Sequence, residues 1–341
     1  MSARLSIFAL GFAIASLVGV SQAVAGCVDE ALTSEAKVNC ALKANSIAEA
    51  SLNAFKPTQP SLGFDELHYR LGRFEFGKDK VNKRFDDWCE SSGLGGAISA
   101  KADARLSDPS SFECKIKIGE ETAASKESMK TAVVGPKGQL FLTDGHHTFT
   151  SFMEAKDGGP QTKVRVLITH NFGDLSDAAF WDAMKANKLV WLRTADDQEI
   201  TPAQLPQSLG MKQFGNDRYR SILYFGRDIG YKQLADNAAF QEFYWGRWLR
   251  NHPTIKIEAY NTNTLEGYLA LLKAVTMAQS ALADDVIVSD GVNAKTLGKL
   301  SPWNNGAPET AGEFAKQSAS YADAKPGKLA YVFEYRKAHN R

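Results

Sequence analysis

The sequence lacks the signatures of several common enzyme classes. It contains no HExxH zinc motif, no paired CxxC motif, no group of acidic residues at metal-ligand spacing and no GxSxG elbow. These absences give no support to a zinc protease, a two-metal nuclease or an α/β serine hydrolase. The formal net charge is only +1 over 341 residues, so binding to nucleic acid would have to come from a local basic patch.

Long apolar runs are also scarce. An uncharged apolar stretch covers residues 5–20, follows Arg4 and precedes the small residues 21–25 (SQAVA). This order predicts a secretory signal peptide cleaved near Ala25, and hence a secreted or periplasmic protein. We expect no transmembrane segment in the mature chain. Its 44% hydrophobic content predicts a sizeable core.

Cysteine is rare, and all four cysteines lie before residue 115: Cys27, Cys40, Cys89 and Cys114. An even number in an exported chain favours two disulfides. Of the three connectivities, local pairing of Cys27 with Cys40 and of Cys89 with Cys114 is favoured. An alternative stays open, because residues 24–27 (VAGC) also fit a lipobox that would place a lipid anchor on Cys27.

Hydrophobic periodicity predicts an α+β fold, with a small sheet followed by a largely helical C-terminal half. A hairpin over residues 131–143 and a strand at 164–168 are the clearest strands, and 189–192 and 329–335 are strand-like. Helices are expected over residues 27–55, 63–70, 146–156, 178–188, 219–226, 240–251 and 265–283. The expected divisions are a signal peptide (1–25), an N-terminal helical segment (26–56), a core (57–205), a helical extension (206–283) and an irregular tail (284–341).

The most informative segment is residues 142–150 (LTDGHHTFT). An apolar strand ends at Asp144 and Gly145, and a helical pattern begins with His146, His147 and Thr148. A strand, a tight turn and a helix start bring several unpaired backbone N–H groups together, and the helix dipole favours an anion there. The segment therefore predicts a site for phosphate or carboxylate beside two imidazoles.

The two histidines could serve acid–base chemistry, metal binding or structure. Adjacent residues on a helix point about 100° apart, so we expect one of His146 and His147 to act on the anion as general acid or base. Asp144 would cap the helix or orient a histidine. Alternatively, these three residues, with His68 or His170, would hold a divalent metal ion. The structural alternative is a well-capped turn with a buried histidine.

Other residues are candidates for ligand contacts. Gly145, Thr148 and Arg70 are expected to bind phosphate. Arginines interleaved with tyrosines and tryptophans over residues 218–250 could clamp phosphates and stack bases. The same pattern fits an amphipathic helix pair with aromatic residues in the core. The possible contacts to nucleic acid or another substrate are Gln59, Arg218, Arg220 and Arg247.

Four segments together resemble one family: residues 57–67 (PTQPSLGFDEL), 133–147 (VVGPKGQLFLTDGHH), 215–224 (GNDRYRSILY) and 242–250 (EFYWGRWLR). Over about residues 57–275 the chain resembles the ParB-like nuclease family, a branch of the ParB/sulfiredoxin superfamily. The resemblance implies a small mixed sheet of ParB/sulfiredoxin type, a strand-to-helix turn that binds phosphate, and cleavage of nucleic acid. Thr148 stands where relatives commonly carry arginine, and this departure argues against a direct transfer of nucleotide hydrolysis to this chain.

The sequence thus predicts a secreted nuclease, a hydrolase that binds a phosphate-bearing ligand, with a divalent metal as a possible cofactor. Two alternatives use the same turn. One is a nucleotide-binding phosphotransferase or nucleotide hydrolase, and the other is a non-catalytic envelope binding module. The near-zero net charge favours the module. A basic channel leading to Asp144 would favour the enzyme.

Overall fold

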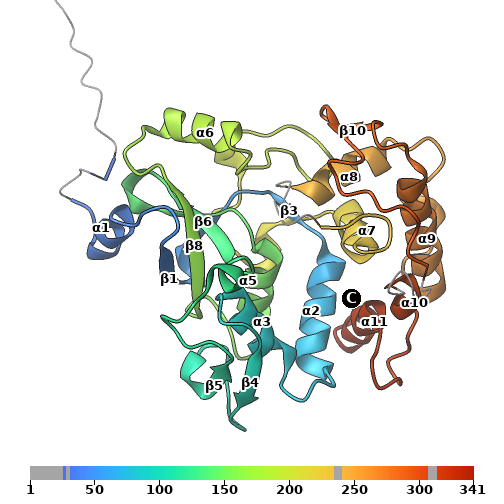
Figure 1. The fold of residues 1–341 in the computed structure, drawn as a ribbon, viewed down its shortest axis with the longest axis horizontal. Coiled ribbons are helices and arrows are strands. Elements are labelled where there is room, and N and C mark those ends of the chain that lie inside the picture. The colour runs from blue at the N-terminus through green and yellow to red at the C-terminus, as the bar shows by residue number, and fades with distance from the viewer. Residues whose placement is uncertain (1–25, 28–30, 234–239, 306–312) are drawn as a thin grey trace, which may run out of the picture.

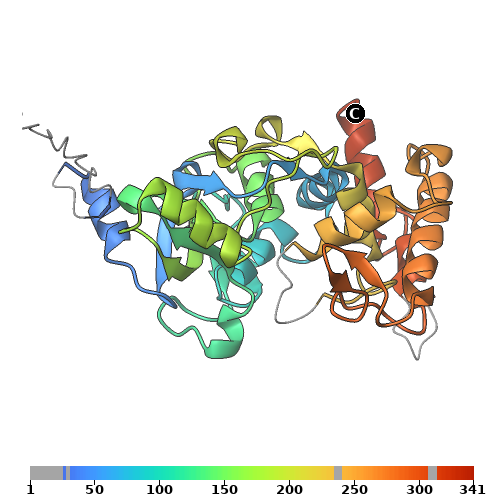
Figure 2. The same cartoon turned by 90° about the horizontal axis from the view of Figure 1, so that it is seen from above.

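The computed structural model describes residues 26–27, 31–233, 240–305 and 313–341 (Figure 1). The predicted signal peptide, residues 1–25, lies outside the described residues. Across these ranges, no helix has both the length and the apolar character needed to cross a bilayer. Viewed from above, the sheet-containing part and the later helices occupy opposite ends of an elongated molecule (Figure 2).

A five-stranded mixed sheet forms the first half, in the order β1-β8-β6-β7-β2. Strands β6 and β7 form the predicted antiparallel hairpin, and β8 lies parallel to β6. The edge strands are β1, antiparallel to β8, and β2, parallel to β7. The strands span β1 Ile47–Ser51, β2 Phe55–Pro57, β6 Lys130–Val134, β7 Leu140–Leu142 and β8 Lys163–Asn171. The predicted α+β class is confirmed.

Helices surround this sheet and make up most of the second half (Figure 1). They are α1 Ser34–Cys40, α2 Phe64–Phe76, α3 Lys83–Ser91, α4 Ala123–Lys126, α5 His146–Glu154, α6 Asp177–Ala186, α7 Arg218–Gly226, α8 Gln241–Arg250, α9 Leu265–Ala281, α10 Glu313–Gln317 and α11 Lys328–Ala338. Short strands complete the fold: β3 Ser61–Leu62, β4 Ala97–Ala100, β5 Phe112–Cys114, β9 Gly215–Asn216, β10 Ile287–Ser289 and β11 Val292–Asn293.

Helix α2 joins two hydrophobic cores. Its Leu67 packs with the sheet, α3 and α5, whereas its Tyr69 packs with α7, α8, α9 and α11. Gly72 allows α11 to approach, because a Cβ at this position would lie 2.4 Å from the carbonyl oxygen of Tyr331. The residues that open α2 are thereby fixed between the sheet and the helical half.

Two segment predictions are wrong. The helix expected over residues 27–55 is limited to α1, and β1 follows it because Ala48 and Ala50 are buried against β8. Tertiary pairing here overrides a local helical preference. The strand expected at 329–335 lies in α11, where Leu329 and Val332 are buried one helical turn apart. The tail from residue 284 therefore contains regular elements instead of being irregular.

Two further segments also differ from expectation. Residues 77–128, which look irregular in the sequence, contain α3, the β4–β5 hairpin and α4. Residues 189–192 do not form the β-strand that the sequence suggested. A single backbone hydrogen bond joins them to the loop after β2, from the N–H of Trp191 to the carbonyl of Thr58 at 2.8 Å.

Both favoured disulfides are present. Cys27 pairs with Cys40 and Cys89 with Cys114, with Cα–Cα distances of 5.6 and 5.5 Å. The first ties the start of the described chain to the end of α1, and the second ties α3 to β5. Two disulfides are compatible with an extracellular location. A Cys27 sulfur held in a disulfide is not available for the lipid anchor of the alternative hypothesis.

Candidate functional site

The turn between β7 and α5 has the predicted open geometry. Gly145 adopts a φ of +99°, and a Cβ here would lie 2.6 Å from Cγ of Lys130, so the turn requires glycine. The first hydrogen bond of α5 runs from the N–H of Phe149 to the carbonyl of Gly145 at 2.8 Å. No side chain caps the helix. The N–H groups of His146, His147 and Thr148 therefore have no acceptor within the helix.

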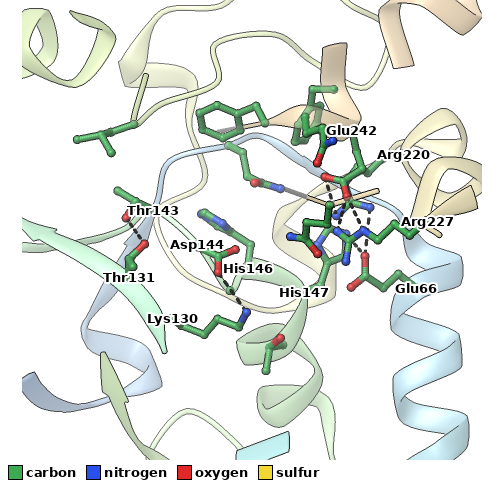
Figure 3. A pocket seen from close by; sticks show the side chains of 18 of the residues that line it. Glu66, Lys130, Thr131, Thr143, Asp144, His146, His147, Arg220, Arg227 and Glu242 are labelled. Carbon is green, nitrogen blue, oxygen red and sulfur yellow. Dashed lines mark hydrogen bonds and ion pairs between the residues drawn. The ribbon is translucent and has the colours of Figure 1, made fainter. Parts of the chain in front are cut away.

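This turn lines a polar cavity of about 330 Å³ (Figure 3). Residues from α2, α7 and α8 form its other walls, so the cavity lies where the sheet half meets the helical half. Basic side chains outnumber acidic ones in the lining: Arg70, Lys130, Lys188, Arg220 and Arg227 against Glu66, Asp144 and Glu242. Such an excess of positive charge in a concave site attracts anions.

His146 is a buried hydrogen-bond acceptor. Its side chain belongs to a residue that is 3% exposed, and its Nε2 accepts the backbone N–H of Thr58 at 3.1 Å. Burial lowers the pKa of His146 to about 4. The ring is therefore neutral at pH 7, with its proton on Nδ1. His146 holds the segment that follows β2 against the start of α5.

His147 plays the same part for the start of α2. Its Nε2 accepts the backbone N–H of Gly63 at 3.0 Å and lies 3.6 Å from Oε2 of Glu66. Burial lowers the pKa of His147 well below its ordinary value. Within the described ranges, Nδ1 of His147 has no hydrogen-bond partner, and the residue lines the cavity. The neutral ring can thus offer its Nδ1 proton to a ligand.

A buried network of charges stands beside His147 (Figure 3). Glu66, which is 2% exposed, pairs with Arg70 at 3.0 Å and with Arg220 at 3.2 Å. Arg220 also lies 3.9 Å from Glu242, which pairs with Arg227. Burial would raise the pKa of Glu66, but the guanidinium groups of Arg220 and Arg70 hold it well below the ordinary value. Glu66 is therefore ionised.

Arg220 is committed to this network. It is only 5% exposed and lines the cavity, and its Nη1 faces Oε2 of Glu66 at 3.2 Å. Among the described residues neither atom has a hydrogen bond of acceptable geometry, so the two are held together as an ion pair.

Asp144 does not play the parts expected from the sequence. Gly145, not Asp144, occupies the N-cap position of α5. The side chain of Asp144 pairs with Lys130 at 3.1 Å at the cavity rim. In the part of the chain that the structure describes, it makes no hydrogen bond to His146 or His147. The Asp144 carboxylate is half exposed, and the neighbouring Lys130 ammonium lowers its pKa. Asp144 is thus an anion that offsets Lys130.

The structure brings only some of the predicted contact residues to the turn. Arg70, Arg220 and Gln59 line the cavity. Arg218 lies outside it and faces Glu258 at 3.8 Å. Arg247 is also outside, because it pairs with Asp197 at 3.1 Å and with Asp290.

The metal-ligand set expected from the sequence is not assembled. His68 stacks on Tyr335 with a centroid distance of 5.5 Å, and His170 lies beside Phe172 at 5.1 Å, so neither joins Asp144 and the paired histidines. Among the described residues, only one group brings possible ligand atoms close enough together for a metal site. This group is Asp86, Asp87 and Glu90.

That acidic group on α3 was missed in the sequence, and its spacing could have revealed it. Lys83, Asp86, Asp87 and Glu90 follow one another at helical spacing. Nζ of Lys83 lies 2.6, 2.8 and 3.1 Å from the three carboxylates. The ammonium therefore occupies the position that a cation would take.

Several cavity residues carried no sequence signal of their own. Glu66 lies within the first family-like segment, but nothing in its spacing connects it with the turn 80 positions later. The other missed residues are Lys130, Lys188 and Glu242. Lys130 lies on β6, Lys188 follows α6, and Glu242 comes from α8, so only the tertiary fold brings them to the cavity.

Comparison with known proteins identifies the family. The model of the family described as "Putative ParB-like nuclease" matches residues 48–251, which is more than half of the chain. The chain belongs to this ParB-like nuclease family, and the predicted resemblance is confirmed. Family membership supports a nuclease that binds nucleic acid, at the level of the family as a whole.

Other comparisons add little. The curated proteins contain no match. Among solved structures, the chain is similar to protein Atu1540 from Agrobacterium tumefaciens, with 16% identity and a TM-score of 0.43. The similarity covers 69% of this chain and 93% of that chain.

Proposed function

We propose that the cavity binds the phosphate groups of nucleic acid and that the chain hydrolyses phosphodiester bonds there. One observation carries the proposal: three unpaired backbone N–H groups at the start of α5 line a cavity in which basic side chains predominate. Backbone N–H groups at a helix start suit phosphate oxygens.

The parts of the site divide between binding and proton transfer. The N–H groups of His147 and Thr148 would hold phosphate oxygens, and Arg220 and Arg227 would offset the charge that develops as water attacks phosphorus. The bond from phosphorus to the leaving oxygen then breaks, and that oxygen takes up a proton.

His147 is the better candidate for acid–base chemistry, and His146 is a positioning residue. His147 can donate a hydrogen bond from Nδ1 to the phosphate. To act as a general base at Nε2, it would have to exchange the N–H of Gly63 for a water molecule. Its lowered pKa leaves the ring neutral at pH 7, so one ring nitrogen carries no proton and could accept one.

A second candidate function is phosphate binding without cleavage, as a non-catalytic binding module would perform it. The observation that favours it is the engagement of both Nε2 atoms by backbone N–H groups. In this case the histidines hold the loop after β2 and the start of α2, and the cavity only binds.

The experiment uses purified mature protein with labelled DNA and RNA oligonucleotides, in chelator and in a series of divalent metals. The variant His147→Gln retains an acceptor near the position of Nε2 but lacks the imidazole. We expect cleavage to fall by about 10²–10⁴-fold, the usual contribution of a general acid or base, with little change in thermal stability. His170→Gln, outside the cavity, is the matched control and should cleave normally. Binding by the unmodified protein without cleavage under any condition would establish the second candidate, and absence of both would refute the proposal.

A further inference from the structure

A second cavity adjoins the phosphate site. It has a volume of about 370 Å³, and its walls combine Trp191, Ile200 and Tyr244 with the charged Lys185, Arg193 and Glu199. Two residues, Lys188 and Phe240, line both cavities. They therefore stand between the open N–H groups of α5 and a recess partly walled by aromatic rings, where a phosphate and the base next to it could lie side by side.

Both boundary residues have left-handed backbones. The φ angle is +54° at Lys188 and +64° at Phe240. Residues other than glycine adopt this conformation only where the surroundings hold them, and such residues gather at ligand sites. Phe240 occupies the N-cap of α8, so its backbone is fixed by the helix that follows.

Phe240 is supported from behind by other aromatic residues. Its ring centroid lies 5.7 Å from that of Trp191 and 5.9 Å from that of Phe243, and both of these supporting residues are buried. Phe240 itself is half-buried. A braced ring with one accessible part is the form of a stacking platform.

Lys188 supplies an uncommitted positive charge beside this ring. It is exposed, and its ammonium group forms no ion pair or hydrogen bond with the described part of the chain. In contrast, Lys130 on the opposite rim is neutralised by Asp144. Lys188 can therefore contact a phosphate without first breaking an existing pair.

We infer that Phe240 stacks on the base next to the phosphate held at α5, that Lys188 contacts the neighbouring phosphate, and that the ligand is a single-stranded nucleic acid. This inference rests on the proposed function and names its substrate class. A flat aromatic ring can stack on any base, but only on one that is not already stacked and paired in a duplex. Recognition should therefore depend on strandedness and weakly on sequence.

The test compares two single-stranded probes of the same length, a labelled oligothymidylate and an oligomer whose nucleotides all lack a base. Fluorescence anisotropy gives the dissociation constant of each. The unmodified protein should bind the oligothymidylate more tightly than the abasic probe and more tightly than a duplex of that length. Phe240→Ala should weaken oligothymidylate binding by about 5- to 150-fold, the range for one stacked base, and leave abasic binding unchanged.

Matched variants separate stacking from folding. Phe240→Trp should restore oligothymidylate affinity, and Tyr260→Ala, an aromatic outside both cavities, should leave both affinities unchanged. Equal affinities of unmodified protein and Phe240→Ala for oligothymidylate, or an equal loss for both probes, would overturn the inference alone. Failure of the unmodified protein to bind even the abasic phosphate chain would instead refute the proposed function.

Discussion

Acidification should destabilise this fold through His146. Burial lowers the pKa of this residue from 6.5 to about 4 in the folded protein, whereas the unfolded chain takes up a proton near the ordinary value. Stability from the neutral ring is therefore fully present above pH 6.5. It is lost as the pH falls through the window from 6.5 to about 4, because protons favour the unfolded chain there.

The magnitude follows from the size of the shift. At 1.36 kcal/mol for each pKa unit, the change amounts to ~3 kcal/mol, as an order of magnitude. The structural event is the loss of the acceptor that Nε2 offers to the N–H of Thr58. His147 shifts in the same direction, so the whole protein should lose more than this single residue explains.

The variant His146→Gln isolates the effect. Glutamine retains an acceptor for Thr58 but does not titrate, so its stability should depend less on pH. Urea unfolding of both proteins at pH 7, 6, 5 and 4 gives the difference directly. We expect the unmodified protein to lose ~3 kcal/mol more than the variant between pH 7 and pH 4. Parallel pH profiles would show that His146 is not a buried neutral acceptor.

Two further perturbations test the framework of the site. Replacing both Cys89 and Cys114 by serine opens a loop with a sequence separation of 25. Calorimetry should then show a loss of roughly 3 kcal/mol in the free energy of unfolding. An unchanged melting temperature would contradict a closed disulfide. Gly145→Ala places a side chain at a φ of +99° and against Lys130, which should cost about 1–3 kcal/mol and weaken oligonucleotide binding. Gly119→Ala, also at a positive φ but with open space around its Cβ, is the control for strain alone and should leave binding intact.

The sequence was most informative where the structure depends on neighbours along the chain. The β6–β7 hairpin, the Asp-Gly turn and α5 follow from alternation, turn residues and helical spacing within about 25 positions. The open N–H groups at the turn could be predicted for the same reason. The two disulfides close short loops, and parity with local pairing was sufficient to find them.

The remainder depends on tertiary packing. Residues 47–51 have a helical composition, yet they form an edge strand because β8 offers a partner. Glu66, Arg227 and Glu242 meet only after α2, α7 and α8 pack together. The two histidines are the clearest example. Their place at the turn predicted a site, but only the structure shows that the backbone N–H groups of Thr58 and Gly63 donate to their rings.

The central claim is that the start of α5 receives phosphate oxygens, and amide chemical shifts test it most directly. A ¹⁵N-labelled sample would be titrated with inorganic phosphate and then with a short single-stranded oligonucleotide. We expect saturable shifts of the His147 and Thr148 amide resonances with both ligands, and the loss of these shifts in Gly145→Ala. Shifts confined to other surfaces, with these two amides unmoved at saturation, would contradict it.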